Sequence, residues 1–153
     1  LDFSRYNDFS ILSYSVGTNW DAGYSCTPGT SDGTYYWRVR QKDYAENLGP
    51  WSSTGSFILD KTGPTAPILV APTSNSYITN TTPYLDWNIG GDAVEYQVMV
   101  DTSNTFPSPI VDITTTDTYY TTSTLSEGTY YWRVRGKDSY DNWDHGVRYF
   151  LFQ

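Results

Sequence analysis

Short stretches of this chain alternate apolar and polar residues with a period of two. The clearest is Gly33–Arg40, in which Tyr35, Trp37 and Val39 are each followed by a residue of the opposite face, a tyrosine and then two arginines. Alternate side chains of a β-strand point to opposite faces, so the pattern predicts a strand that buries one face. The same eight letters, GTYYWRVR, recur at Gly128–Arg135. The chain therefore contains two copies of one structural module.

The two copies are offset by 95 residues, close to the length of one immunoglobulin-type β-sandwich. In the second copy the alternation predicts strands at Ile68–Val70, Leu85–Trp87, Tyr96–Val100, Ile110–Ile113, Asp117–Thr121, Gly128–Gly136 and Val147–Phe152. In the first copy it predicts strands at Leu1–Phe3, Leu12–Val16, Ala22–Cys26, Gly33–Arg40 and Ser56–Leu59, with a loop at Gln41–Pro50. The side chains predicted to form the cores are Tyr35, Trp37, Val39, Leu85, Trp87, Tyr96, Val98, Tyr130, Trp132 and Val134.

This pattern predicts an all-β chain of two tandem seven-stranded sandwiches, of which the first is incomplete. Residues 1–60 hold only the C-terminal strands of a module, residues 61–66 form a proline-containing linker, and residues 67–153 form a complete module. The repeat places the counterpart of residues 65–97 before Leu1, so we expect an excerpt or a processed product. The missing strands are expected either from an upstream part of the same polypeptide or from another subunit.

Composition agrees with an all-β fold. Aromatic residues make up 18% of the chain and charged residues only 17%, and no helical spacing of apolar residues persists. The formal net charge of −8 repels phosphate backbones and anionic lipid, so nucleic acid and membrane surfaces are not expected partners. No apolar run is long enough to span a membrane. One cysteine, Cys26, provides no disulfide framework.

Several motifs resemble the fibronectin type III and related immunoglobulin-like modules of secreted and cell-surface proteins of bacteria and archaea. They are TPYLDW, VEYQVMVD, EGTYYWRVRGKD and the step from Asp138 to Asn142. The resemblance covers residues 65–153 and the last four strands of the fold in residues 1–60. It implies a β-sandwich and an extracellular or cell-surface location, and its motifs are specific for the fold but say little about function. Either Tyr130 or Tyr131 fills the tyrosine-corner position of such modules.

One loop gathers oxygen-bearing side chains that could bind calcium. Asp138, Asp141 and Asp144 lie within seven residues, together with Asn142 and His145. Calcium prefers such oxygen ligands, although the spacing matches no EF-hand loop. The favoured interpretation is a turn stabilised by polar side chains. Calcium is thus the one cofactor considered, and no other cofactor is expected.

No motif indicates catalysis. Cys26 has no histidine within its own module, and His145 is the only histidine in the chain. The chain has no HExxH, CxxC or P-loop pattern. The sequence Asn80-Thr81-Thr82 is an N-glycosylation sequon in a predicted turn.

The sequence favours a non-enzymatic extracellular structural module that builds a cell-surface layer, stalk or filament. Its expected partners are further copies or neighbouring modules of the same protein. The alternative is a carbohydrate-binding or spacer module of a secreted glycan-degrading enzyme or adhesin, with glycans as partners. Exposed aromatic residues would then stack on sugar rings, and the candidates are Trp20, Trp51, Trp143 and Tyr140. The competing interpretation of Trp51 and Trp143 is cation–π stacking with the outward-facing arginines of the repeat.

Overall fold

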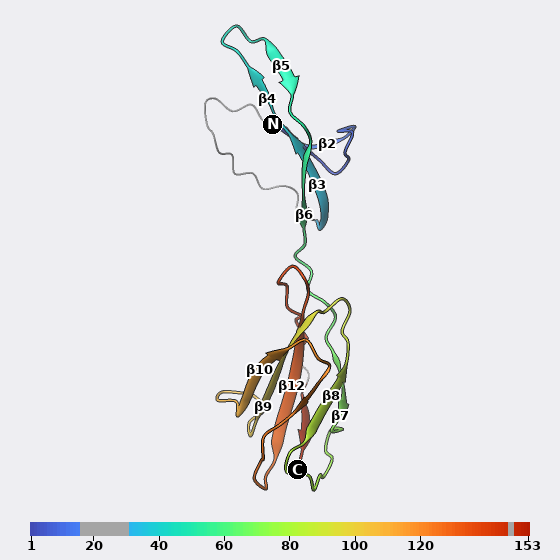
Figure 1. The fold of residues 1–153 in the computed structure, drawn as a ribbon, viewed down its shortest axis with the longest axis vertical. Helices are drawn as coiled ribbons and strands as arrows, with labels where there is room; N and C mark the ends of the chain where they lie inside the picture. Colours follow the sequence, from blue (N-terminus) through green and yellow to red (C-terminus); the bar gives the residue numbers. More distant parts are fainter. Residues whose placement is uncertain (16–30, 147–148) are drawn as a thin grey trace. The chain divides into compact units, whose positions relative to one another are not determined.

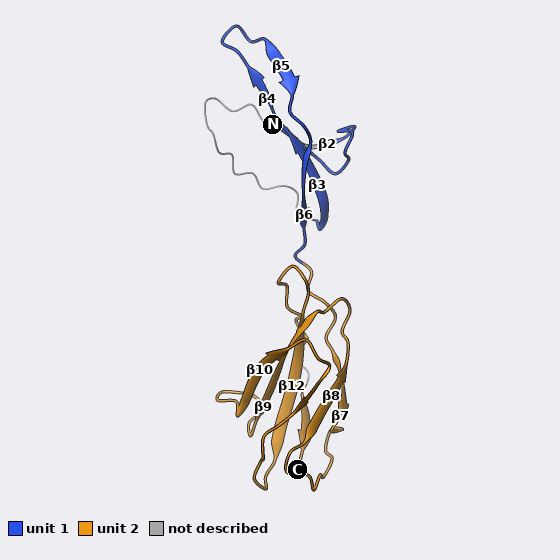
Figure 2. Ribbon diagram, in the orientation of Figure 1, with its two compact units in different colours: residues 1–61 blue, residues 62–153 orange. Residues whose placement is uncertain are grey.

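The computed structural model describes residues 1–15, 31–146 and 149–153 (Figure 1). The chain divides into two compact units, Leu1–Lys61 and Thr62–Gln153 (Figure 2). All regular secondary structure in the described residues is β-strand, which confirms the predicted all-β class. Within these residues no helix is long and apolar enough to cross a membrane.

The described part of the second unit contains seven strands in two sheets. They are β7 (Ile68–Ala71), β8 (Tyr84–Asn88), β9 (Glu95–Asp101), β10 (Val111–Thr115), β11 (Tyr119–Thr121), β12 (Tyr130–Lys137) and β13 (Phe150–Phe152). One sheet has the order β11-β8-β7 and the other has the order β10-β9-β12-β13, with every neighbouring pair antiparallel. The period-two alternation gives each sheet one apolar face, and the two apolar faces pack on each other.

The core of the second unit is built around two tryptophans. Trp132 of β12 lies opposite Val100 of β9 and meets the ring of Phe150 edge-on at 6.1 Å. Trp87 of β8 meets the ring of Tyr96 edge-on at 5.8 Å. The buried cluster consists of Leu69, Leu85, Trp87, Tyr96, Val98, Val100, Val111, Leu125, Tyr130, Trp132, Val134 and Phe152.

The described part of the first unit contains one four-stranded sheet and a separate strand pair. The strands are β1 (Asp2–Ser4), β2 (Leu12–Ser15), β3 (Gly33–Arg38), β4 (Arg40–Lys42), β5 (Leu48–Trp51) and β6 (Gly55–Leu59). The sheet has the order β2-β1-β3-β6, and β4 pairs with β5. The predicted strand Ala22–Cys26 lies outside the described residues.

Two predictions for the first unit need correction. Gly33–Arg40 is not one strand, because Val39 interrupts it: its N–H donates to Ser52 Oγ at 3.0 Å and its carbonyl accepts from the Ser52 amide at 2.7 Å. The predicted loop Gln41–Pro50 contains most of β5. Within the part of the chain that the structure describes, that strand pairs only with β4, and proline is tolerated on a strand with a free edge.

Most of the segment predicted as a linker belongs to the second unit, which begins at Thr62. Pro64 is buried, and a Cβ added at Gly63 would collide with the carbonyl oxygen of Trp143. These residues therefore pack against the second sandwich instead of forming a free connection.

Candidate interaction surface of the first unit

The inward face of the β2-β1-β3-β6 sheet carries an aromatic cluster. The rings of Tyr35 and Phe57 stack at 5.6 Å with 14° between their planes, and Phe3 meets Phe57 edge-on at 6.3 Å. Antiparallel pairing brings these side chains together, since Tyr35 lies opposite Phe57 and Phe3 lies opposite Trp37. Tyr35 and Phe3 are buried.

The same face is uncovered at its other end. Trp37 and Val39 were predicted to be core residues, but they are 37% and 40% exposed. The physical reason is that, among the described residues, no second sheet lies on this face. Trp37 instead lies over Gly55, where an added Cβ would collide with the indole ring.

The second unit shows what the uncovered residues lack. Its four-stranded sheet has the same order and the same pairings: Trp132 lies opposite Val100 as Trp37 lies opposite Phe3, and Tyr130 lies opposite Phe152 as Tyr35 lies opposite Phe57. There Trp132 and Val134, the counterparts of Trp37 and Val39, are only 0% and 3% exposed. They are buried because the β11-β8-β7 sheet covers them.

Each unit also has a tyrosine corner. Tyr130 Oη donates a hydrogen bond to the carbonyl of Ser126 at 3.0 Å, and Tyr35 Oη donates to the carbonyl of Ser31 at 2.8 Å. The corner residue is therefore Tyr130, while the Tyr131 ring contacts Tyr149. In the first unit the Arg5 guanidinium, to which no sequence motif pointed, lies 4.8 Å from the Tyr35 ring centroid.

The outer faces of both four-stranded sheets are covered by cation–π stacks. Arg38 lies 4.0 Å from the Phe9 ring centroid and 4.2 Å from that of Trp51, and it pairs with Asp2 at 3.2 Å. In the second unit Arg133 lies 4.2 Å from the Phe106 ring and Arg135 lies 4.2 Å from the Trp143 ring. Trp51 and Trp143, two of the proposed sugar-stacking residues, thus already contact guanidinium groups. Of the other two candidates, Tyr140 is exposed and Trp20 lies outside the described residues.

Sequence reasoning assigned no role to Phe9 and Phe106. Both have a positive φ, 57° and 53°, and both close a turn by donating their amide to a carbonyl three residues earlier. Each ring then lies under an arginine of the repeat. One feature of the sequence could have pointed to this shared role. Phe9 and Phe106 lie 97 residues apart, and each follows, after a short turn, the strand that pairs with the GTYYWRVR segment.

The calcium candidates contact their own loop. Asp138 Oδ1 accepts the amides of Tyr140 and Asn142 at 2.8 and 2.9 Å, and Oδ2 accepts the Asn142 side chain at 2.9 Å. Asp144 accepts the amides of Gly136 and Gly146, and Asp141 pairs with Lys137 at 3.1 Å. The described residues contain no group of three acidic, histidine or cysteine side chains placed to hold a metal ion.

The first unit repeats this turn with a different loop. Asp43 accepts the amide of Asn47 at 2.8 Å and its side chain at 2.9 Å, as Asp138 does with Asn142. Lys42 pairs with Glu46 at 3.0 Å. Because the same bonds recur where the other acidic residues differ, these carboxylates stabilise a turn that leads out of the repeated strand.

Acid should weaken the Asp138 turn. Burial raises the pKa of Asp138, but hydrogen bonds from Asn142 and Tyr140 and the charge of Lys137 lower it below its ordinary value. Its stabilising contribution is therefore present above the unfolded-state pKa of about 3.9 and is lost as the pH falls through the lower folded-state pKa. We expect Asp138→Asn to lower the melting temperature at pH 7. Below about pH 4 the melting temperature of this variant should decrease less steeply with pH than that of the parent chain.

The exposed Asp92, for which no side-chain hydrogen bond is found in the described structure, provides the matched control variant, Asp92→Asn. Thermal melts followed by circular dichroism from pH 7 to about pH 2 would measure the effect. An identical acid profile for both variants and the parent chain would contradict this role for Asp138.

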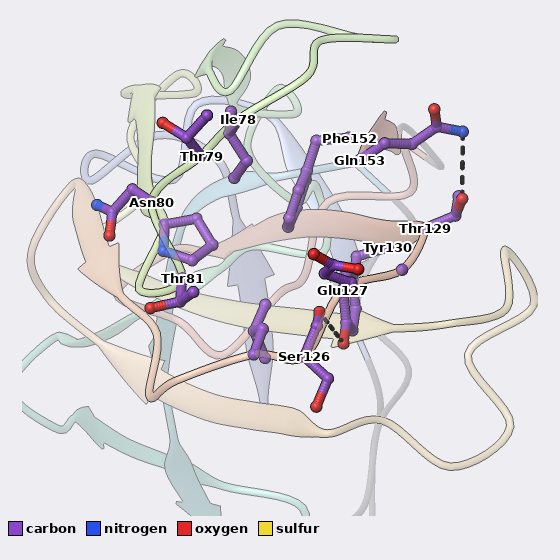
Figure 3. A pocket seen from close by; sticks show the side chains of 13 residues that line it. Ile78, Thr79, Asn80, Thr81, Ser126, Glu127, Thr129, Tyr130, Phe152 and Gln153 are labelled. Atoms are coloured by element: carbon purple, nitrogen blue, oxygen red, sulfur yellow. Dashed lines mark hydrogen bonds between the residues drawn. The ribbon is translucent and has the colours of Figure 1, made fainter.

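Asn80 lies at the edge of a pocket at one end of the second sandwich, shown in Figure 3. The pocket has a volume of about 580 Å³, and its apolar wall includes Ile78, Leu125, Tyr130 and Phe152. Asn80 is exposed, and its side chain is held in a turn: Oδ1 accepts from the Thr82 amide and hydroxyl, both at 3.0 Å. The sequon thus presents its acceptor side chain at the surface.

The strand order and the tyrosine corner define the class of the second unit. Three strands face four, neighbouring strands are antiparallel, and the corner tyrosine stands at the start of β12. These are features of the immunoglobulin-like β-sandwich, and the fold of the unit is fibronectin type III-like.

The comparisons with known proteins concern the fold. No protein-family model matches the sequence, and no curated protein matches it. Among solved structures, the chain is similar to an Fn3-like protein from Clostridium thermocellum, with 22% identity and a TM-score of 0.44 over 61% of this chain and 92% of that protein. It is also similar to an α-L-rhamnosidase from Dictyoglumus thermophilum, with 17% identity and a TM-score of 0.46 over 60% of this chain and 12% of the enzyme.

Proposed function

We propose that this chain is a non-enzymatic structural segment of an extracellular protein built from tandem fibronectin type III-like modules. The second unit carries both sheets of a module, and the described part of the first carries the four-stranded sheet of another. The observation that carries the proposal is the uncovered inward face of the first unit, where Trp37 and Val39 are exposed although their counterparts in the second unit are buried. Such a segment acts as a building block of a surface layer, stalk or filament.

The chemistry of the outer faces supports a structural role. The arginines of the repeat are paired with aromatic rings of their own unit, as in Arg38 with Phe9 and Arg133 with Phe106. Such stacks contribute about 0.5 to 1 kcal/mol each when exposed. An extracellular location is supported by the exposed Asn80 sequon and by the resemblance to modules of secreted proteins.

The energetics of a half-sandwich make completion necessary. A chain of about 60 residues buries too little apolar surface to be more than marginally stable even when its core is closed. Here part of the core face is open, and the large buried cluster of the described chain contains residues of the second unit alone. We infer that the first unit is completed by further strands, which would join it to the rest of an extended assembly.

Amide hydrogen exchange on the 153-residue chain as a dilute monomer would test this proposal. We expect the amides of Gly33–Arg38 to exchange at least about 100-fold faster than those of Tyr130–Lys137, which corresponds to about 2.8 kcal/mol less protection. The two strands share the sequence Tyr-Tyr-Trp-Arg, at residues 35–38 and 130–133 of one molecule, so the equivalent amides of each strand serve as the control for the other. Equal protection of both strands would contradict the proposal.

One observation favours a carbohydrate-binding module as the second candidate. Tyr84 of β8 and Tyr119 of β11 stack at 5.5 Å, and they are 49% and 48% exposed on the outer face of the three-stranded sheet. Apolar ring faces of this kind suit a sugar ring, because they are partly desolvated and flat. Desolvation and the charge of the neighbouring Asp86 raise the pKa of Tyr84.

A polysaccharide titration would separate the two functions. We expect no saturable change in intrinsic fluorescence with soluble cell-wall polysaccharides. Saturable binding that is lost in Tyr84→Ala and Tyr119→Ala, and kept in Tyr44→Ala, would instead favour the carbohydrate-binding function. Tyr44 is a suitable control because it is the most exposed aromatic residue of the described chain.

A further inference from the structure

The uncovered face of the first unit has a template in the same molecule. Four inward positions carry closely matched side chains in the two units: Tyr35 and Tyr130, Trp37 and Trp132, Val39 and Val134, Phe57 and Phe152. The sheets that carry them have the same strand order. A segment that fits the face in the second unit is therefore the best guide to what fits it in the first.

In the second unit, residues 68–88 cover this face in two ways. Leu69 of β7 and Leu85 and Trp87 of β8 pack their side chains into the shared core, without a backbone ladder between the two sheets. Between these strands, the segment around Ser76 runs parallel to β13 and pairs with its outer edge. Its backbone bonds are Asn75 N to Leu151 O at 2.6 Å, Ile78 N to Gln153 O at 2.7 Å and Gln153 N to Ser76 O at 2.9 Å.

The first unit has both features that residues 68–88 contact in the second unit, an inward face and an edge strand. Its face is open at Trp37 and Val39, and β6, the counterpart of β13, is the last strand of its sheet. Ile58 of β6 is exposed. Simple addition of a strand at an edge would leave Trp37 in water, whereas a second layer would cover it.

We infer that the first unit binds a strand–turn–strand segment with the pattern of residues 68–88: a first apolar strand, a short stretch that pairs in parallel with β6, and a second strand with Leu-x-Trp alternation over Trp37. This inference rests on the proposed function and names the partner of that site. A second copy of the chain does not supply the segment, because its own Leu85 and Trp87 are fully buried in its second unit. The segment is therefore one from outside these 153 residues.

A synthetic peptide of residues 62–91 is the matched probe, because it is the segment that covers the near-identical face of the second unit. Added to the full chain, it is expected to slow amide exchange of both β3 and β6 at least about tenfold while β12 stays unchanged. It should also shift tryptophan emission to shorter wavelength, since Trp37 leaves water. A peptide with Leu85→Asp and Trp87→Asp, and the chain variant Trp37→Ser, should both abolish these changes.

A fusion of residues 62–91 to the N-terminus of the chain through a flexible glycine–serine linker provides a second measurement that does not depend on peptide solubility. Protection of β3 and β6 in the fusion, lost with Trp37→Ser, would support the inference. Slowed exchange at β6 alone, without shielding of Trp37, would overturn it in favour of edge addition, and no protection with either probe would overturn it outright. If the proposed function were wrong, β3 would already be protected from exchange before any probe is added. That result can be told apart from the two results that overturn this inference.

Discussion

Replacing Trp132 with alanine is expected to unfold the second unit at room temperature or to bring it close to unfolding. Trp132 is fully buried between the two sheets and meets Phe150 edge-on. Large-to-small changes at such positions cost roughly 3 to 5 kcal/mol. A whole domain is stable by only about 5 to 15 kcal/mol. Near-ultraviolet circular dichroism and thermal melts would measure the loss.

Trp143→Ala is the matched control. Trp143 belongs to the same unit but is partly exposed, and its ring contacts Arg135 and Lys137 on the outer face. Losing such contacts should cost only about 1 kcal/mol. Similar melting temperatures for Trp132→Ala and Trp143→Ala would show that the assignment of inward and outward faces in β12 and its neighbours is wrong.

Replacing Gly90 with alanine should also destabilise the second unit, although the change adds only one methyl group. A Cβ at Gly90 would collide with the carbonyl oxygen of Thr65 and lie 2.7 Å from backbone atoms of Ala66 and Pro67. These are backbone atoms, so the clash cannot be relieved by turning a side chain. Overpacking of this kind costs about 1 to 3 kcal/mol, or a fall of at least about 4 °C in melting temperature for a unit of this size.

Gly128→Ala serves as the control for Gly90→Ala. The atoms nearest to a Cβ at Gly128 belong to the Tyr130 side chain, and the nearest of them lies at an ordinary contact distance of 3.6 Å. Its melting temperature should stay within about 2 °C of the parent chain, as for most substitutions at open surface sites. An equal fall for both variants would show that residues 64–67 do not pack tightly on the second sandwich.

How far the sequence predicts this protein can be seen by comparing one strand in its two copies. The alternation in GTYYWRVR predicts the strand and its two faces, because the pleat repeats every two residues in any β-sheet. It predicts burial equally for Trp37 and Trp132. The structure separates them, since the first is 37% exposed and the second 0%. Burial depends on a second layer, and a strand's own sequence does not state whether that layer is present.

The turn after the repeated strand shows the same limit for side-chain chemistry. Asp138, Asp141 and Asp144 are close in sequence, and oxygen-rich spacing alone fits either a turn or a calcium loop. The structure shows the Asp138 carboxylate accepting the amides of Tyr140 and Asn142. The direction in which a carboxylate points follows from local backbone dihedral angles, among them the positive φ of 67° at Asp141. That angle cannot be read from composition or spacing.

The sequence by itself determined the all-β class, the repeat and the inward-facing residues of the second unit, because all three follow from local periodicity and from near-identity between two segments. Only the tertiary structure decided that Tyr130 forms the corner, that Phe9 and Phe106 lie under arginines, and that residues 62–66 pack on the second sandwich. It also showed that the core face of the first unit is open among the described residues. The Tyr130 corner depends on a side chain that turns back to the carbonyl of Ser126, and the other features depend on contacts between residues far apart in the chain. Local periodicity specifies neither kind of contact.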